Sequence, residues 1–377
     1  MYVCTYDLMN TKLKIGMIIP SFRPIVGGAE KQLEGLLKSL KPYDAKITVF
    51  TRMASKSLKY EQSTNYELYR LNSSIPKIGF GISLFFNLIR FHKKFDLIHC
   101  HSLSGQSSVV SILIGAILRK PVILKVTRSG NDAQIANLKK SFFGRFLLYL
   151  FKIGSSKFIA ITQDVKNELI DLEVKKENIE EIPNGVSIFQ QKKIKDLESI
   201  SIITIGRLIN RKRIDMLIEL IPELNKDFNV TLNIAGSGPN ENKLKNQVKN
   251  LNISKNVNFL GQIEKKEIEY HLNKADMFVL PSESEGMSNA LLEAMSAGLP
   301  SVVADIPANK SLILDGKTGK TFHDSSSLRN AIFDLCDNFK LRTSIGNSAQ
   351  KLIKEKYSFN KIADDYYNLY MELLNEL

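Results

Sequence analysis

Short apolar runs alternate with longer amphipathic stretches along most of the chain. In the first half several of the runs are nearly continuous in hydrophobic residues, which is typical of parallel strands covered on both faces. Strands are predicted there at Lys14–Pro20, Lys46–Thr51, Tyr66–Leu71, Asp96–His101, Val122–Thr127, Phe158–Thr162 and Glu180–Pro183. Helices are predicted between them, including Ala29–Leu40, Ile82–His92, Gly105–Leu118, Ala133–Ile153 and Asp164–Leu172. This alternation predicts a doubly wound α/β sheet.

A lysine-rich, weakly apolar stretch at Ser187–Ser199 interrupts the pattern, which then starts again. Strands are predicted at Ser201–Ile205, Val230–Ala235, Val257–Leu260, Met277–Leu280 and Ser301–Ala304. Helices are predicted at Ile214–Leu224, Glu241–Asn250, Lys265–Asn273, Ser288–Ala297, Leu328–Asn338, Leu341–Lys356 and Asn360–Leu373.

The repeated pattern predicts two Rossmann-like domains of similar size. We place them at residues 1–190 and 191–358, with a C-terminal helix at 359–377 that docks back on the first domain. Parallel sheets bind ligands beyond the carboxyl ends of their strands. Two such domains facing each other are therefore expected to bind ligands in the cleft between them.

Charge is distributed unevenly along the 377 residues. The formal net charge is +13, and residues 1–190 carry 27 Lys and Arg against 15 Asp and Glu, a net charge of +12. The remaining residues carry 25 and 24, a net charge of +1. A concentrated positive field suggests an anionic partner, such as nucleic acid, acidic lipid or a phosphorylated substrate. A merely solubilising surface is the alternative.

Neither a disulfide framework nor a membrane span is predicted. The three cysteines, Cys4, Cys100 and Cys336, lie far apart in the sequence, which fits a reducing cytoplasm. No apolar run approaches the ~18 to 20 residues that a membrane span needs. No charged-then-apolar leader is evident either, so the expected location is the cytoplasm.

Two cations follow the first strand of the second domain. Arg207 comes directly after the strand and its glycine, and Lys212 stands where the next helix begins. Cations just past the carboxyl end of a parallel strand are placed to hold a phosphate or diphosphate. A basic turn with solvated side chains, which Arg211 and Arg213 adjoin, is the alternative reading.

Two glycine pairs stand at strand-to-helix turns. Gly236 and Gly238 follow a strand of the second domain, and Gly27 and Gly28 follow the first strand of the chain. Glycine allows close backbone approach, and the amides of a helix N-terminus favour an anion. The second-domain segment lacks the full dinucleotide-binding fingerprint, so simple turns remain an alternative for both pairs.

The most informative segment is 280–298. A strand ends at Pro281, a polar loop holds Glu285, and Glu293 follows eight residues later within a helix. Glu293 is the one polar residue in the run 290–295, so it is either partly buried or turned into a cleft, where it needs hydrogen-bond donors. Sugar hydroxyls would supply them. An exposed glutamate on a core helix is the alternative.

These motifs together resemble the retaining glycosyltransferases of family 4, which have the GT-B fold of two facing Rossmann-like domains. The resemblance covers almost the whole chain in sequence order. It rests on Gly27-Gly28-Ala29-Glu30, Asp96-Leu-Ile-His-Cys-His101, Ile182-Pro-Asn-Gly-Val186, Gly206-Arg-Leu with Lys212, Gly236-Ser-Gly-Pro239, and Pro281-Ser282 followed by Glu285 and Glu293.

The resemblance implies roles for these residues. Arg207, Lys212 and Glu285 would be catalytic, the two cations as a clamp on the donor diphosphate and the glutamate as a contact to the hydroxyls of the transferred sugar. Glu293 resembles the ligand of the ribose, and Gly28 the glycine beneath the diphosphate. The other implied substrate-binding residues are Gly27, Glu30, His99, His101, Arg128, Gly236, Gly238, Gly286, Met287, Ser288 and Asn289.

The resemblance also implies that no metal or other cofactor is needed, and the chain has no Asp-x-Asp motif. Zinc is the rival explanation of His99 and His101, but no third ligand lies near them in sequence. Arg128 stands near the place where family members often have a histidine, a departure that suggests an acceptor carrying phosphate.

The implied activity is transfer of a sugar from a nucleotide-diphosphate-sugar, preferably a UDP-sugar. The implied acceptor is a saccharide, preferably lipid-linked, in bacterial surface polysaccharide or glycolipid synthesis. Two segments that mix aromatic, aliphatic and basic residues, Ile78–Phe95 and Phe142–Ile153, could insert at the anionic cytoplasmic face of the membrane. Alternatively, both helices merely cover the first sheet.

Two other functions compete with sugar transfer. A nucleotide-sugar epimerase would share the architecture and the diphosphate donor but would need no acceptor site. A non-catalytic nucleic-acid binder would explain the positive charge, but it predicts basic residues on both domains. The pair Glu285 and Glu293 and the uneven charge favour a transferase that does not bind nucleic acid.

Overall fold

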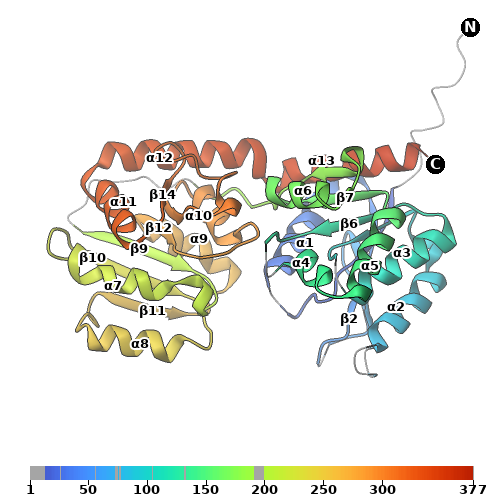
Figure 1. Ribbon diagram of the computed structural model, residues 1–377, viewed down its shortest axis with the longest axis horizontal. Helices are drawn as coiled ribbons and strands as arrows, with labels where there is room; N and C mark the ends of the chain where they lie inside the picture. The colour runs from blue at the N-terminus through green and yellow to red at the C-terminus, as the bar shows by residue number, and fades with distance from the viewer. Residues whose placement is uncertain are drawn as a thin grey trace, which may run out of the picture. The chain divides into compact units, whose positions relative to one another are not determined.

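The chain folds into two compact units. The computed structural model describes residues 13–376 except 26, 56, 73–74, 76–77, 104, 131–132 and 191–198, so most of the predicted lysine-rich linker lies outside the described residues. One unit consists of Met1–Asn184 together with Phe359–Leu377, and the other of Gly185–Ser358 (Figure 1). The first unit is therefore interrupted after Asn184. The predicted boundary between the two domains lay six residues later, after residue 190.

The first unit is built on a sheet whose eight described strands run in the order β3-β4-β2-β1-β5-β6-β7-β8. The pairing of β3 with β4 is antiparallel, and the other pairings are parallel. The strands are β1 (Lys14–Ile18), β2 (Lys46–Arg52), β3 (Tyr60–Gln62), β4 (Tyr66–Leu71), β5 (Leu97–Cys100), β6 (Val122–Val126), β7 (Lys157–Ala160) and β8 (Ile179–Glu181).

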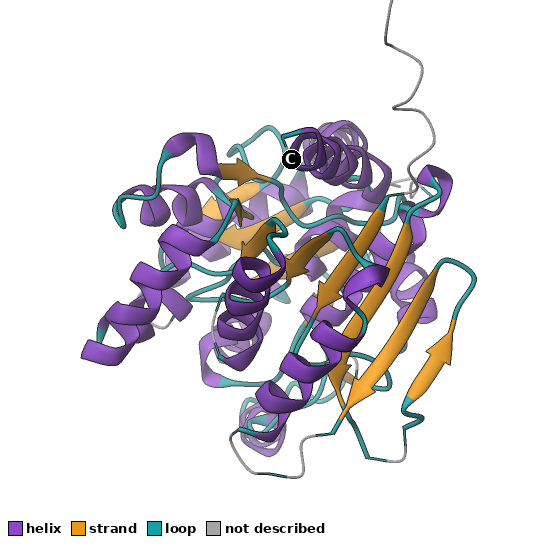
Figure 2. Ribbon diagram, turned by 90° about the vertical axis from the view of Figure 1, so that its right-hand side faces the viewer, coloured by secondary structure: helices purple, strands orange, loops and turns teal. Residues whose placement is uncertain are grey.

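Helices cover both faces of this sheet (Figure 2). They are α1 (Gly28–Ser39), α2 (Gly79–Arg90), α3 (Gln106–Leu118), α4 (Gln134–Lys139), α5 (Phe142–Gly154), α6 (Gln163–Ile170) and, from the end of the chain, α13 (Phe359–Asn375). Helices α1 and α13 share a buried cluster with one face of the sheet, which includes Ile15, Ile123 and Ile159. Helix α3 packs on β5 and β6 and contacts α2 and α5.

One predicted helix, Ala133–Ile153, is wrong as a single element. The structure ends α4 at Lys139 and starts α5 at Phe142. Ser141 caps the new helix, because its hydroxyl accepts a hydrogen bond from the Gly144 amide at 3.0 Å. A Cβ at Gly144 would lie 2.1 Å from the Leu138 carbonyl oxygen, so only glycine allows the two helices to approach this closely.

The second unit repeats the architecture with a sheet in the order β11-β10-β9-β12-β13-β14, and the pairings between its described strands are parallel. The strands are β9 (Ile200–Ile205), β10 (Val230–Ala235), β11 (Val257–Gly261), β12 (Met277–Leu280), β13 (Ser301–Ala304) and β14 (Lys320–Phe322). The helices are α7 (Ile214–Leu224), α8 (Glu241–Asn250), α9 (Lys265–Lys274), α10 (Asn289–Ser296), α11 (Ser325–Asp337) and α12 (Phe339–Leu352), which a π-helical turn at Ile353–Tyr357 follows.

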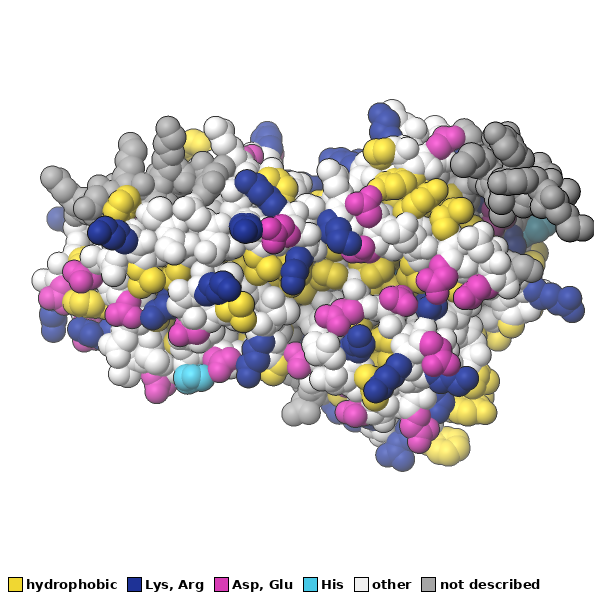
Figure 3. All heavy atoms as spheres, turned by 90° about the horizontal axis from the view of Figure 1, so that it is seen from above, with side chains coloured by type: hydrophobic (Ala, Val, Ile, Leu, Met, Phe, Trp, Pro, Cys, Tyr) yellow, Lys and Arg dark blue, Asp and Glu magenta, His cyan; other side chains and the backbone are white. Residues whose placement is uncertain are grey.

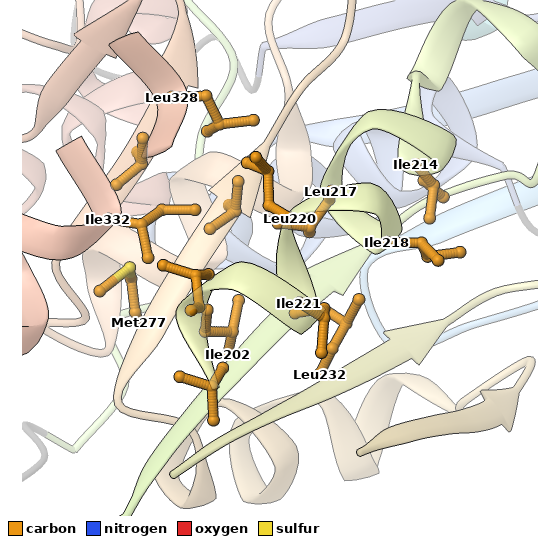
Figure 4. Close-up of a cluster of buried hydrophobic side chains, with 14 of the residues drawn as sticks. Ile202, Ile214, Leu217, Ile218, Leu220, Ile221, Leu232, Met277, Leu328 and Ile332 are labelled. Carbon is orange, nitrogen blue, oxygen red and sulfur yellow. The ribbon is translucent and has the colours of Figure 1, made fainter. Parts of the chain in front are cut away.

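The core of the second unit lies between its strands and helices α7 and α11. Ile202 and Met277 from the sheet meet Leu217 and Ile221 of α7 in one buried cluster, with Ile332 from α11 (Figure 4). Burying an aliphatic side chain of this size contributes about 1.5 to 3 kcal/mol. This packing fixes the sheet from which the candidate site extends.

The two doubly wound sheets and the return of the C-terminal helix to the first of them are confirmed. Two short edge strands, β3 and β14, were not predicted. Each is three residues long, and β14 carries two half-buried residues and one buried one, so neither shows the continuous apolar run of an internal strand.

We predict that Gly35→Ala loosens the contact between α1 and α13. A Cβ at Gly35 would lie 2.0 Å from the Phe359 ring, so the variant should lose about 1 to 3 kcal/mol of stability. Alanine has the better helix propensity, by about 1 kcal/mol, and this gain opposes the expected loss. Urea unfolding followed by circular dichroism measures the net effect.

The matched control is Gly35→Ala combined with Phe359→Ala. If the clash is the cause, the double variant should lose less stability than the two single losses together. A fully additive double variant would contradict the packing.

Candidate active site

The second-unit motifs lie at one edge of its sheet. Strand β9 lies between β10 and β12, and all three are parallel. The segments that follow them therefore leave the sheet at the same carboxyl edge. The chain order also reverses there, since β10 and β11 lie on one side of β9 and β12 to β14 on the other. Such a switch point is the usual ligand-binding place of an open α/β sheet.

Direct backbone contact joins the first two of these segments. The Leu208 amide donates to the Ser237 carbonyl at 2.9 Å. A Cβ at Gly236 would lie 1.9 Å from the Gly206 carbonyl oxygen, and one at Gly238 would lie 2.4 Å from that of Leu208. Gly236 also has φ +141°, a conformation that residues with side chains rarely adopt. The predicted glycine turn thus has a structural role, in that it holds the Arg207 segment against β10.

Lys212 and Glu285 form an ion pair, which the sequence did not reveal. The Lys212 Nζ lies 2.5 Å from Glu285 Oε1, and the two side chains are only 14% and 10% exposed. The lysine stem passes over Gly206, where a Cβ would lie 3.3 Å from the Lys212 Cε. An ammonium and a carboxylate with little solvent around them are a strong local dipole. An arriving diphosphate would share the lysine, and hydroxyl groups would find an acceptor in the glutamate.

Arg207, by contrast, is exposed. The neighbouring arginines are engaged in fixing the loops: the Arg211 carbonyl accepts from the Glu283 amide at 2.9 Å, and the Arg213 guanidinium lies 2.7 Å from Glu283 Oε1. The alternative reading of a basic turn therefore describes Arg213, whose charge is paired at the surface. Arg207 keeps its guanidinium accessible at the carboxyl edge.

Helix α10 presents its N-terminus near the same edge, because it follows β12 after a short loop. Ser288 caps it by accepting from the Leu291 amide at 3.3 Å, and both Met287 and Ser288 are buried. Glu293, on the second turn, is half-buried and makes an interaction of its own. Gly286 and Asn289 are half-buried as well.

In the first unit, Gly27 and Gly28 stand at the N-terminus of α1. Gly27 is the N-cap in extended conformation, and α1 begins at Gly28. A Cβ at Gly27 would lie 2.5 Å from a carboxylate oxygen of Glu30, so this side chain folds back over the start of the helix. The negative charge of Glu30 interacts favourably with the dipole of α1 at its N-terminus. The predicted phosphate-binding amides thus have a carboxylate of their own chain beside them.

His99 and His101 share one face of the sheet, as their spacing predicts. Their rings stack at 4.0 Å between centroids. His99 is fully buried, and its Nδ1 lies 2.7 Å from the Tyr370 hydroxyl on α13. The His99 side chain thus contacts both His101 and the C-terminal helix, and its role in substrate binding stays a prediction. Sequence spacing could not reveal a partner 271 residues away.

Arg128 is half-buried just beyond the end of β6 and makes interactions of its own. Lys125, three residues earlier within that strand, is 5% exposed, and sequence analysis did not single it out. Its signal was a charged residue inside a strand that is otherwise apolar and buried throughout. Over the described ranges, no three His, Cys, Asp or Glu side chains gather as a metal site would require.

Comparison with known families identifies both halves of the chain. Residues 26–188 match the model of Glycosyltransferase Family 4, and residues 187–352 match that of Glycosyl transferases group 1. An uncharacterized glycosyltransferase of Methanocaldococcus jannaschii is 27% identical over 368 residues, which are 95% of this chain and 98% of the relative. The alpha-monoglucosyldiacylglycerol synthase of Streptococcus pneumoniae is 25% identical over 85% of this chain and 78% of its own.

Solved structures agree on the fold. HepE of Anabaena, determined in complex with UDP, has a TM-score of 0.79 at 21% identity and covers 97% of this chain and 100% of its own. The chain has the GT-B fold and belongs to the family 4, or group 1, glycosyltransferases. It is accordingly a glycosyltransferase that takes its sugar from a nucleotide-sugar donor, which decides against both the epimerase and the nucleic-acid binder.

We predict that Gly236→Ala disrupts the carboxyl edge of β9. The new methyl group would collide with the Gly206 backbone, which cannot rotate away as a side chain could. The expected loss of stability is about 3 kcal/mol or more, since overpacking adds to left-handed strain. Urea unfolding is the measurement.

Gly316→Ala is the matched control. Gly316 also has a positive φ, +70°, but no atom lies within 4 Å of its would-be Cβ. It should lose only about 1 to 2 kcal/mol, the strain of the backbone conformation. Equal losses in the two variants would contradict the close approach at Gly236.

Proposed function

We propose that this enzyme transfers a sugar, with retention of anomeric configuration, from a UDP-sugar to a saccharide acceptor carried on a lipid. The observation that carries the donor half of the proposal is the largely buried pair of Lys212 and Glu285 beside the exposed Arg207, at the switch point of the second sheet. This arrangement combines cations for a diphosphate with an acceptor for sugar hydroxyls.

The two halves of the donor are assigned to different side chains. Arg207 and Lys212 bind the diphosphate, and Glu285 accepts hydrogen bonds from the transferred sugar. The backbone of Gly286 and its neighbours at the start of α10 lies beside that sugar, and Glu293 binds the ribose. HepE of Anabaena, whose structures include complexes with UDP and with UDP-glucose, supports the choice of uridine.

The reaction is a displacement on one face of the sugar. The bond between the anomeric carbon and the diphosphate oxygen breaks as the acceptor oxygen forms a bond to the same carbon. The acceptor proton passes to the departing phosphate oxygen, so the products are the glycoside and UDP. Catalysis then comes from positioning and from cations that stabilise the leaving group.

The first unit is proposed to bind the acceptor and to rest on an anionic membrane surface. Helix α5 turns large side chains to solvent, with Phe142 91% exposed, and Arg145 on the same helix is also exposed. Other exposed apolar residues of α5, α2 and α3 are Phe143, Phe146, Tyr149, Ile153, Ile82, Phe86, Ile89, Leu113 and Ile117. An apolar cavity of about 290 Å³ lies among these three helices, lined by Ile78, Val109 and Leu147 among others.

Aromatic side chains with basic neighbours match the interface of an anionic bilayer, where each cation near the surface is worth about 1 kcal/mol. The face of the first unit that carries α13, by contrast, mixes acidic and basic side chains (Figure 3). Among the described helices none is both long and apolar enough to span a bilayer. Two relatives support a lipid or surface acceptor by their names, the Streptococcus synthase and CapM of Staphylococcus aureus, a capsular polysaccharide biosynthesis glycosyltransferase.

We predict that Arg207→Ala lowers turnover by about 100-fold, equivalent to ~3 kcal/mol of barrier, because one preorganised donor to the leaving group is lost. The assay is release of nucleoside diphosphate from a panel of UDP-sugars and GDP-sugars, with and without membrane lipid extract. Arg329→Ala is the control, since Arg329 pairs with Glu223 at the surface of α11 and should leave turnover unchanged. Unchanged turnover of Arg207→Ala would remove this cation from the mechanism.

We also predict that the double variant Phe142→Asp, Phe146→Asp reduces binding to anionic vesicles by more than ~10-fold. Two exposed aromatic side chains that would insert into the bilayer are lost, and two negative charges that the anionic surface repels are added. The measurement is flotation with phosphatidylglycerol vesicles, with neutral phosphatidylcholine vesicles alongside. Tyr270→Asp on α9 is the matched control, because Tyr270 is 55% exposed in the second unit. If the wild-type protein binds neither type of vesicle, the membrane proposal is wrong.

A further inference from the structure

A buried polar cluster lies in the first unit, at the carboxyl ends of β5 and β6. The strand register pairs His99 with Ile123 and Cys100 with Leu124, so His101 and Lys125 come next on the face that also carries His99. Helix α13 covers this face with Tyr366 and Tyr370.

The cluster is almost closed to solvent. His99 is fully buried, Lys125 is 5% exposed and His101 8%. The Lys125 Nζ lies 5.7 Å from the centre of the Tyr366 ring, a cation–π distance. His101 stacks on His99, which the Tyr370 hydroxyl holds at 2.7 Å. His101 and Lys125 keep these small exposed fractions, whereas His99 has none.

The hydrogen-bonding groups of this cluster are incompletely satisfied. The Nε2 atoms of His99 and His101 and the hydroxyl of Tyr366 are buried without a hydrogen-bond partner among the residues that the structure describes. Nine in ten buried polar groups in proteins do have a partner, so three unpartnered ones in a single cluster call for an occupant.

The charge of Lys125 is likewise uncompensated by the described residues. Burial is the one cause that acts on its pKa, lowering it to about 8, and no described carboxylate raises it. The amine is therefore still mostly protonated at neutral pH, and it is a cation without a counter-ion among the residues that the structure describes. Burial and Lys125 also lower the pKa of His101 to about 3, so its ring is neutral and can donate from one nitrogen.

These donors fit an oxyanion. A buried ammonium excludes a metal ion by repulsion, and a neutral ligand would leave its charge uncompensated. A phosphate group offers several acceptor oxygens and a compensating negative charge. Arg128, three residues further along the chain from Lys125, adds a second cation at the end of β6.

We propose that Lys125 and His101 form a subsite for a phosphate group of the acceptor substrate, with His99 and Tyr370 as positioning residues that fix the His101 ring. The inference rests on the proposed function, in which the first unit binds the acceptor. It adds that the acceptor carries a phosphate group.

The test is calorimetric titration of the full chain with inorganic phosphate in the presence of saturating UDP, which keeps phosphate away from the donor diphosphate site. Wild-type protein should bind phosphate with a Kd at or below about 1 mM. Lys125→Met should weaken this binding by at least ~10-fold, as expected for loss of a charge-assisted contact. Its UDP affinity should be unchanged.

Lys46→Met is the matched control and should bind phosphate as the wild type does. Lys46 is an exposed residue at the amino end of β2, on the opposite edge of the same sheet. Lys125→Met should also melt no lower than the wild type, since it removes a buried uncompensated charge. Lys125→Gln serves as a second variant if the methionine does not fold, and it too should lose phosphate binding.

The outcomes separate the two proposals. No saturable phosphate binding by UDP-bound wild-type protein, or equal binding by the Lys125 variants, overturns the phosphate subsite and leaves the transferase proposal standing. If UDP itself fails to bind, the proposed donor specificity fails, and the phosphate titration without UDP then still tests the subsite.

Discussion

The candidate donor site depends on a backbone contact between two turns, one after β10 and the other after β9. Gly236 approaches the Gly206 carbonyl so closely that no side chain fits between them. This contact sets the path of the chain after β9, and that path carries Arg207 and then Lys212. Lys212 pairs with Glu285, which follows β12 on the other side of β9. The segments after three adjacent strands, β10, β9 and β12, are therefore in contact at one edge of the sheet. The ion pair is the chemical result of a packing constraint.

The two units use their buried polar groups differently. In the second unit, Lys212 and Glu285 neutralise each other, so the site is electrically balanced before any ligand arrives. In the first unit, the Lys125 ammonium lies 5.7 Å from the centre of the Tyr366 ring on α13. Desolvating a charge without an opposite charge costs free energy, and groups with strongly perturbed pKa values cluster at functional sites. The difference matches the proposed roles, in which the second unit binds the diphosphate of the donor and the first unit binds a phosphate group of the acceptor.

The C-terminal helix links fold and function in the first unit. Helix α13 closes the hydrophobic face of the sheet with Ile362 and Leu369, and it also supplies the hydroxyl that holds His99. Its end is tied down by Glu372, which lies 2.9 Å from the Lys157 ammonium. A segment from the far end of the chain therefore determines the environment of residues at the end of β5. Core packing and site geometry are inseparable at this point.

The sequence by itself determined the class of fold, because the alternation of apolar runs and amphipathic helices depends only on local periodicity. It also marked Arg207, Gly236, Glu285 and Glu293, since residue type and spacing carry the family resemblance. Tertiary structure decided the rest: the break at Ser141, the pairing of Lys212 with Glu285, and the burial of His99 behind Tyr370. Each of these depends on atoms distant in sequence or on a steric limit such as that at Gly144, and local periodicity contains no information about either.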